Sequence, residues 1–168
     1  MIDSMMNHNN LSVYLNDHLA GSVAGVEILD QLTDLLKDSE FGAAINSVRG
    51  EIEHDRDALE ALAERLEIRQ SSIRKASGWL AEKAVTLKLL VDDPGSGPLR
   101  IFESLEALSL GIEGKRLLWT TLADIARNDP RIDSTECSEM IGRSEDQRHR
   151  VETMRRDVAQ KAFIDVAE

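Results

Sequence analysis

The stretch INSVRGEIEHDRDALEALAERLEI, residues 45–68, decides the fold of this chain. Apolar side chains recur in it every three or four residues, which is the spacing of one face of an α-helix. We therefore predict an amphipathic helix that begins with Ser39 as its N-cap and ends near Ile68. Its inward line is Phe41, Ile45, Val48, Ile52, Asp55, Leu59, Leu62 and Leu66.

The same spacing recurs on both sides of this stretch, so the sequence predicts an all-α chain. No run of β-branched or aromatic residues alternates with polar ones as a half-buried strand would. The segment DDPGSGP, residues 92–98, is the strongest helix breaker. The last helix is expected to begin with Ser134 as its cap. The further helices are predicted over about 11–37, 71–91, 99–127 and 134–167.

The order of these helices predicts two hairpins with one long crossover. A short break joins each pair of long helices, so the members of a pair are expected to be antiparallel neighbours. The connection over residues 69–98 can run the full height of the bundle, because a helix rises about 1.5 Å per residue. Residues 1–10 are expected to be a flexible N-terminus, and residues 11–168 a single helical-bundle domain.

Composition restricts the classes of partner. The 168 residues carry a net charge of −11, which repels phosphate backbones and anionic lipid, so neither nucleic acid nor a membrane is expected as a partner. Residues 1–10 lack the basic and apolar regions of a signal peptide, and a cytoplasmic location is expected. The single cysteine, Cys137, fits a reducing compartment and is interpreted as a small apolar helix residue.

Three segments give the chain a resemblance to a known family. They are YLNDHLAGSVAGVE at residues 14–27, the E-x-x-H sequence Glu51–His54, and the D-x-x-H sequence Asp146–His149. Together they resemble the ferritin-like superfamily. The resemblance implies an antiparallel four-helix bundle with a helical crossover between the second and third long helices. It also implies a site for two iron or manganese ions in the bundle core.

The chemistry of that implied site is that of carboxylate and imidazole ligands. Residues three apart lie on the same side of a helix, so a glutamate and a histidine in E-x-x-H can share a metal ion. A site of this kind holds a pair of iron or manganese ions. The alternative function is therefore that of a dimetal-carboxylate protein with oxidase activity. The candidate metal ligands are Glu51, His54, His18, Asp55, Glu106 and Glu113.

The ligand set that the resemblance implies is incomplete in this sequence. Ser22 stands where the first helix should supply a glutamate, and His149 falls opposite the inward line of the last helix. Our leading interpretation is therefore a non-catalytic ferritin-like protein with no cofactor and no catalytic residue. It is expected to act through protein–protein contacts or self-association, as a homo-oligomer. In this interpretation the polar residues form a hydrogen-bonded layer or lie at the solvent edge.

Small residues gather around Gly21 and Gly25 in the first helix. Each glycine costs about 1 kcal/mol relative to alanine in a helix interior, so a compensating reason is expected. Two explanations stay open, namely the close approach of a neighbouring helix or space for a ligand or a partner's side chain. Gly111 and Gly114 form a similar pair in the third long helix.

Overall fold

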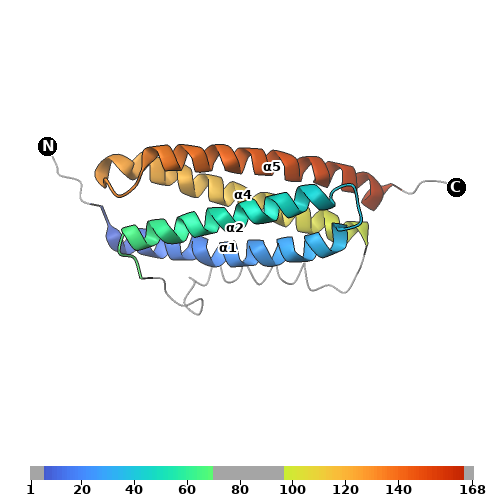
Figure 1. The fold of residues 1–168 in the computed structure, drawn as a ribbon, viewed down its shortest axis with the longest axis horizontal. Helices are drawn as coiled ribbons and strands as arrows, with labels where there is room; N and C mark the ends of the chain where they lie inside the picture. The colour runs from blue at the N-terminus through green and yellow to red at the C-terminus, as the bar shows by residue number, and fades with distance from the viewer. Residues whose placement is uncertain (1–5, 70–96, 165–168) are drawn as a thin grey trace.

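The computed structural model describes residues 6–69 and 97–164 (Figure 1). Within these ranges 86% of the residues are helical and no strand occurs, which confirms the all-α prediction. The predicted helix over residues 71–91 lies outside the described residues. The elements are α1 (His8–Leu36), α2 (Gly42–Arg65), α4 (Pro98–Ile125), a short 3₁₀ helix (Ala126–Asn128) and α5 (Ser134–Phe163).

The N-caps of α1 and α5 explain where these helices begin. The Asn7 side chain accepts a hydrogen bond from the backbone N–H of Asn10 at 3.1 Å, so α1 begins before the predicted start at residue 11. In α5 the cap is Asp133, one residue before the predicted Ser134. Asp133 has an extended backbone, and its carboxylate accepts from the Thr135 N–H at 2.8 Å. A carboxylate at this position is also stabilised by the positive end of the helix dipole.

The turn between α1 and α2 is tight, and it starts α2 later than predicted. Ser39 does not cap α2. Its hydroxyl donates to the carbonyl oxygen of Leu36 at 2.7 Å and accepts from the N–H of Phe41 at 3.2 Å, which precedes α2. Phe41 is the N-cap of α2 and makes no side-chain capping bond. A Cβ at Gly42 would lie 2.8 Å from the Leu36 oxygen and 2.7 Å from the Lys37 oxygen, so this turn requires glycine.

Two apolar clusters pack between the described α-helices, and each cluster contains residues of all four of them. The first cluster combines the end of α1 and the start of α2 with the start of α4 and the end of α5. Its members are Ile28, Leu29, Leu32, Leu36, Ile45, Val48, Ile52, Leu105, Ala107, Leu108, Ile112, Val151, Met154 and Val158. The second cluster combines the opposite ends of the helices. Its members are Leu11, Leu15, Leu59, Leu62, Ala63, Leu66, Ile68, Leu118, Trp119, Leu122, Ile132, Cys137 and Met140.

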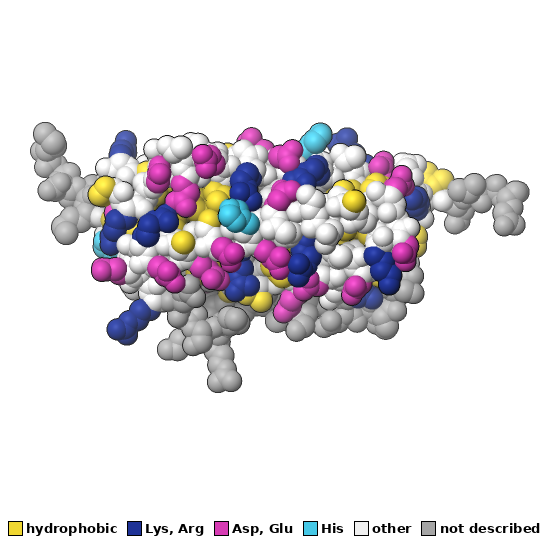
Figure 2. Space-filling view, viewed as in Figure 1, with side chains coloured by type: hydrophobic (Ala, Val, Ile, Leu, Met, Phe, Trp, Pro, Cys, Tyr) yellow, Lys and Arg dark blue, Asp and Glu magenta, His cyan; other side chains and the backbone are white. Residues whose placement is uncertain are grey.

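The inward line predicted for residues 45–66 is confirmed by burial. In α2 every residue of the predicted line from Ile45 to Leu66 is buried. Trp119 is fully buried in the second cluster, and Cys137 is buried in the same cluster, as the interpretation of a small apolar residue expects. No helix in residues 6–69 and 97–164 is both long enough and apolar enough to cross a membrane. Acidic and basic side chains are interspersed over the face that Figure 2 shows.

Candidate functional site

A layer of polar side chains separates the two apolar clusters. In α2 the first cluster ends at Ile52 and the second begins at Leu59, and the buried residue between them is Asp55. The corresponding positions are Lys115 in α4 and Gln147 in α5. Three helices therefore each place a polar side chain at the same height of the bundle.

Asp55 is the centre of this layer. Only 2% of its surface is exposed, and burial of a carboxylate this deep requires partners. The Lys115 ammonium donates to Oδ2 of Asp55 and also to the side-chain oxygen of Gln147. The Gln147 amide nitrogen donates to the same Asp55 oxygen at 3.0 Å. Lysine and glutamine thus bind one carboxylate oxygen and each other, which closes a triangle across α2, α4 and α5.

A second carboxylate, Glu51, lies one turn earlier on α2 at the edge of the layer. Arg150 of α5 binds both of its oxygens, Nη1 at 3.0 Å and Nη2 at 2.5 Å. Ser47 donates to it at 2.9 Å, and the Gln147 amide at 3.2 Å. The hydrogen bond from Arg150 is the main reason why the pKa of Glu51 falls from 4.5 to about 2, against the opposing effect of burial. Glu51 is therefore a carboxylate at any ordinary pH.

Charge in the layer is balanced by side chains of the protein. Arg143 places Nη2 2.7 Å from Oδ1 of Asp55, although this oxygen has no aligned hydrogen-bond donor among the described residues. Arg150 also pairs with Asp146 at 2.9 Å. Three acidic groups thus face three basic groups, the acids Glu51, Asp55 and Asp146 against Lys115, Arg143 and Arg150.

Lys115 is the most deeply buried cation of the layer. Burial lowers the pKa of its ammonium, and the neighbouring Asp55 carboxylate raises it again in part. Arg143 adds a further lowering effect through repulsion between like charges. The Asp55 carboxylate therefore favours the charged form of this ammonium group against the effect of burial.

Two of the predicted metal ligands, Glu51 and Asp55, lie in this layer, and the other two carboxylates do not. Glu106 is exposed, and its side chain pairs with Arg155 at 3.2 Å. Glu113 binds Arg116 on its own helix at 2.7 Å, and this arginine lowers the pKa of Glu113. Both residues lie off the inward line of α4, on its outer side.

The histidines are exposed or half-buried and are not members of the buried layer. His54 is exposed on α2, and His149 is exposed on α5. His18 is half-buried on α1 and contacts the ring of Tyr14 edge-on, with ring centroids 4.7 Å apart. Burial lowers the pKa of His18, with a smaller opposing effect from Asp17. A neutral imidazole packed on tyrosine needs no metal to be stable.

The donor set of the layer does not fit a dimetal site. In the described ranges, no three His, Cys, Asp or Glu side chains converge as metal ligands would. Oδ2 of Asp55 and both oxygens of Glu51 are bound by cations of the protein. Divalent ions would have to displace Lys115 and Arg150 and would then face the remaining positive charge of Arg143.

Sequence reasoning missed Lys115, although a signal for it is present. Lys115 follows Ile112 by three residues and precedes Trp119 by four, so it stands on the inward line of α4. A charged residue on an apolar line predicts a buried partner of opposite charge. Asp55 occupies the matching place on the line of α2. Arg143 has no such signal, because it reaches the layer from the flank of α5.

The glycines of α1 have no close neighbour in the part of the chain that the structure describes. A Cβ built at Gly21 or Gly25 meets no described atom within 4 Å, and the same holds for Gly111 and Gly114. Close approach of α2, α4 or α5 to the α1 glycines is therefore not the reason for them.

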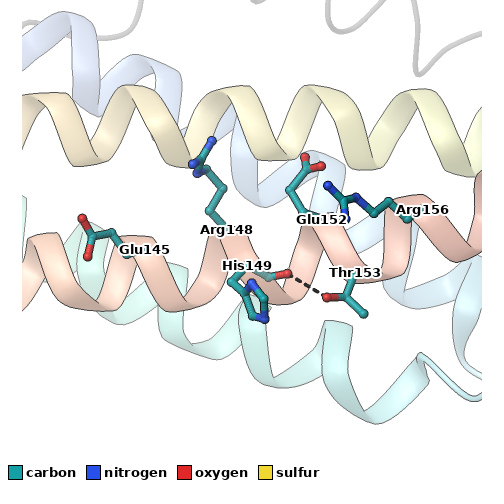
Figure 3. A pocket seen from close by; sticks show the side chains of 6 residues that line it. All are labelled: Glu145, Arg148, His149, Glu152, Thr153 and Arg156. Atoms are coloured by element: carbon teal, nitrogen blue, oxygen red, sulfur yellow. Dashed lines mark hydrogen bonds between the residues drawn. The ribbon is translucent and has the colours of Figure 1, made fainter.

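A shallow depression lies on the outer surface of α5 and is shown in Figure 3. Arg148 and Glu152 point toward α4, whereas His149 points to the other side of the helix (Figure 3). Arg148 pairs with Glu113 at 3.5 Å, and Glu152 with Arg155 at 3.0 Å. We interpret this depression as a solvated helix surface.

No family model, no curated protein and no solved structure matches this chain. The contacts described above are therefore the only support for an assignment of function.

Proposed function

We propose that this chain is a non-catalytic, ferritin-like helical bundle that acts through contacts with another protein. The observation that carries the proposal is the ion-paired layer around Asp55 and Glu51. Residues that would bind metal in a dimetal protein are bound here by lysine and arginine. A bundle core neutralised in this way has no open coordination position for oxygen or a substrate.

The membership of the two apolar clusters supports the ferritin-like part of the proposal. One cluster combines the end of α1 and the start of α2 with the start of α4 and the end of α5. The other cluster combines the opposite ends of the same four helices. Two antiparallel hairpins with the crossover between them account for this membership. The dimetal alternative requires the same helices, but it also requires that Lys115 and Arg150 leave their carboxylates.

An iron-oxidation assay tests the non-catalytic part. Purified protein is mixed with Fe(II) in air, and formation of Fe(III) is followed by absorbance, with Glu51→Ala as the matched control. We expect both proteins to give the rate of buffer alone. Oxidation by the native chain that is faster than buffer, and that Glu51→Ala abolishes, would establish the dimetal alternative.

A further inference from the structure

The outer side of α4 carries large apolar residues in water. Leu110 is 73% exposed, Leu117 49% and Leu99 48%. At about 100° per residue, the three leucines lie within about 20° of one line along the helix. Leu99 and Leu117 are about 27 Å apart along this line. An ordinary amphipathic helix would carry polar residues here, since the opposite side of α4 already contributes the apolar residues that pack in both clusters.

The charged residues on this side of α4 are all acidic. They are Glu103, Glu106, Glu113 and Asp124, and all lie within about 40° of the leucine line. Arg155 neutralises Glu106, and Arg116 neutralises Glu113. Glu103 and Asp124 form no ion pair with any residue in 6–69 or 97–164.

Charge decides which kind of partner fits this surface. A second copy of the chain would bring the same acidic line against it, and both copies would carry a net charge of −11. Like charges that face each other across an interface disfavour that partner. A helix with lysine or arginine beside its apolar line would instead pair with Glu103 and Asp124.

We infer that the outer side of α4 binds an amphipathic, basic helix of another protein. Leu99, Leu110 and Leu117 provide the apolar contact, and Glu103 and Asp124 select for positive charge. This inference rests on the proposed function, because it names the class of partner that a non-catalytic bundle would contact. Helix-on-helix recognition of this kind uses apolar anchors on one helical line. Leu110 and Leu117 are about two turns apart, and Leu99 lies about three turns before Leu110.

The test uses the full chain and two synthetic peptides that differ only in charge. Each peptide has about 24 residues, with leucines along one helical line and either lysine or glutamate at the flanking positions. Binding is measured by fluorescence anisotropy of the labelled peptide. We expect the lysine peptide to bind at least tenfold more tightly than the glutamate peptide, and added salt to reduce the difference.

Variants locate the site on the protein. Leu110→Ser and Leu117→Ser should each weaken binding of the lysine peptide at least tenfold, and Glu103→Gln should weaken it severalfold. Val13→Ser is the matched control, because Val13 is an apolar residue of α1 that is 51% exposed, close to the 49% of Leu117. Circular dichroism of each variant checks that the fold is retained.

Three results would overturn the inference. These are the absence of lysine-peptide binding, equal binding by Leu110→Ser and the native chain, and a dimer in sedimentation that Leu110→Ser dissociates. The third result would assign the surface to a second copy. None of them affects the iron-oxidation assay, so the two proposals fail separately.

Discussion

Removal of the Lys115 ammonium is the perturbation that bears most directly on the buried layer. Lys115→Met keeps the aliphatic part of the side chain and deletes the charge that binds Asp55 and Gln147. The substitution leaves the Asp55 carboxylate, which is 2% exposed, with less positive charge beside it. We therefore expect the variant to fold and to be clearly less stable than the native chain.

The size of the effect follows from the partners that remain. Loss of one member of a buried ion pair costs about 3–5 kcal/mol when the other member is left uncompensated. Asp55 still has Arg143 at 2.7 Å and Gln147 at 3.0 Å, which favours the lower end, about 3 kcal/mol. For a chain of this length, that loss corresponds to a fall in Tm of about 6–12 °C.

Urea unfolding followed by circular dichroism measures the difference in free energy of unfolding. Arg148→Met is the matched control. Arg148 also forms an ion pair between two helices, in its case with Glu113 of α4, but its side chain is 48% exposed. A pair at the surface contributes about 0–1 kcal/mol, so the control should stay close to the native stability.

A double-mutant cycle separates the ion pair from other effects of the substitution. Asp55→Leu combined with Lys115→Met should cost less than the sum of the two single changes by at least about 1 kcal/mol. The reasoning fails if Lys115→Met is as stable as the native chain, or if the two changes are additive.

Three other predictions follow from the described contacts. Because the pKa of Glu51 is about 2 in the folded chain and 4.5 ordinarily, its contribution to stability is present above about pH 4.5 and is lost as the pH falls toward 2. Urea unfolding of Glu51→Gln should therefore differ from that of the native chain at pH 6 and converge with it near pH 2. The Cys137 thiol is buried and has a pKa raised to about 11, first by burial and then by Glu136, so iodoacetamide at pH 8 should modify it only after unfolding. Mass spectrometry measures this, and rapid modification of the native chain would contradict the burial. Gly111→Ala should raise the free energy of unfolding by about 1 kcal/mol, since alanine is the better helix former and no described atom obstructs its Cβ. A loss of stability in urea unfolding would indicate a contact that the described residues do not show.

The helices and their inward lines were predictable because apolar spacing alone determines them. The line from Ile45 to Leu66 is buried as predicted, including its polar member Asp55. Helix ends were less predictable, since they depend on which of several adjacent polar residues captures a backbone N–H. Asp133 rather than Ser134 caps α5 for this reason.

The buried layer was only half predictable. Asp55 was recognised as an inward position, and Lys115 could have been recognised in the same way, because it too interrupts an apolar line. Arg143 and Arg150 could not, because long side chains reach the layer from outside the inward line of α5. Which arginine meets which carboxylate depends on how far α5 is shifted along α2, and spacing within one helix carries no information about that shift.

Elemental analysis of the purified protein measures whether the buried layer binds metal, with the protein expressed in medium supplemented with iron and manganese and Glu51→Ala analysed beside it. We expect the same trace content of metal in both proteins, because Lys115, Arg143 and Arg150 already neutralise the buried carboxylates. About two equivalents of iron or manganese in the native chain, lost in Glu51→Ala, would contradict this expectation.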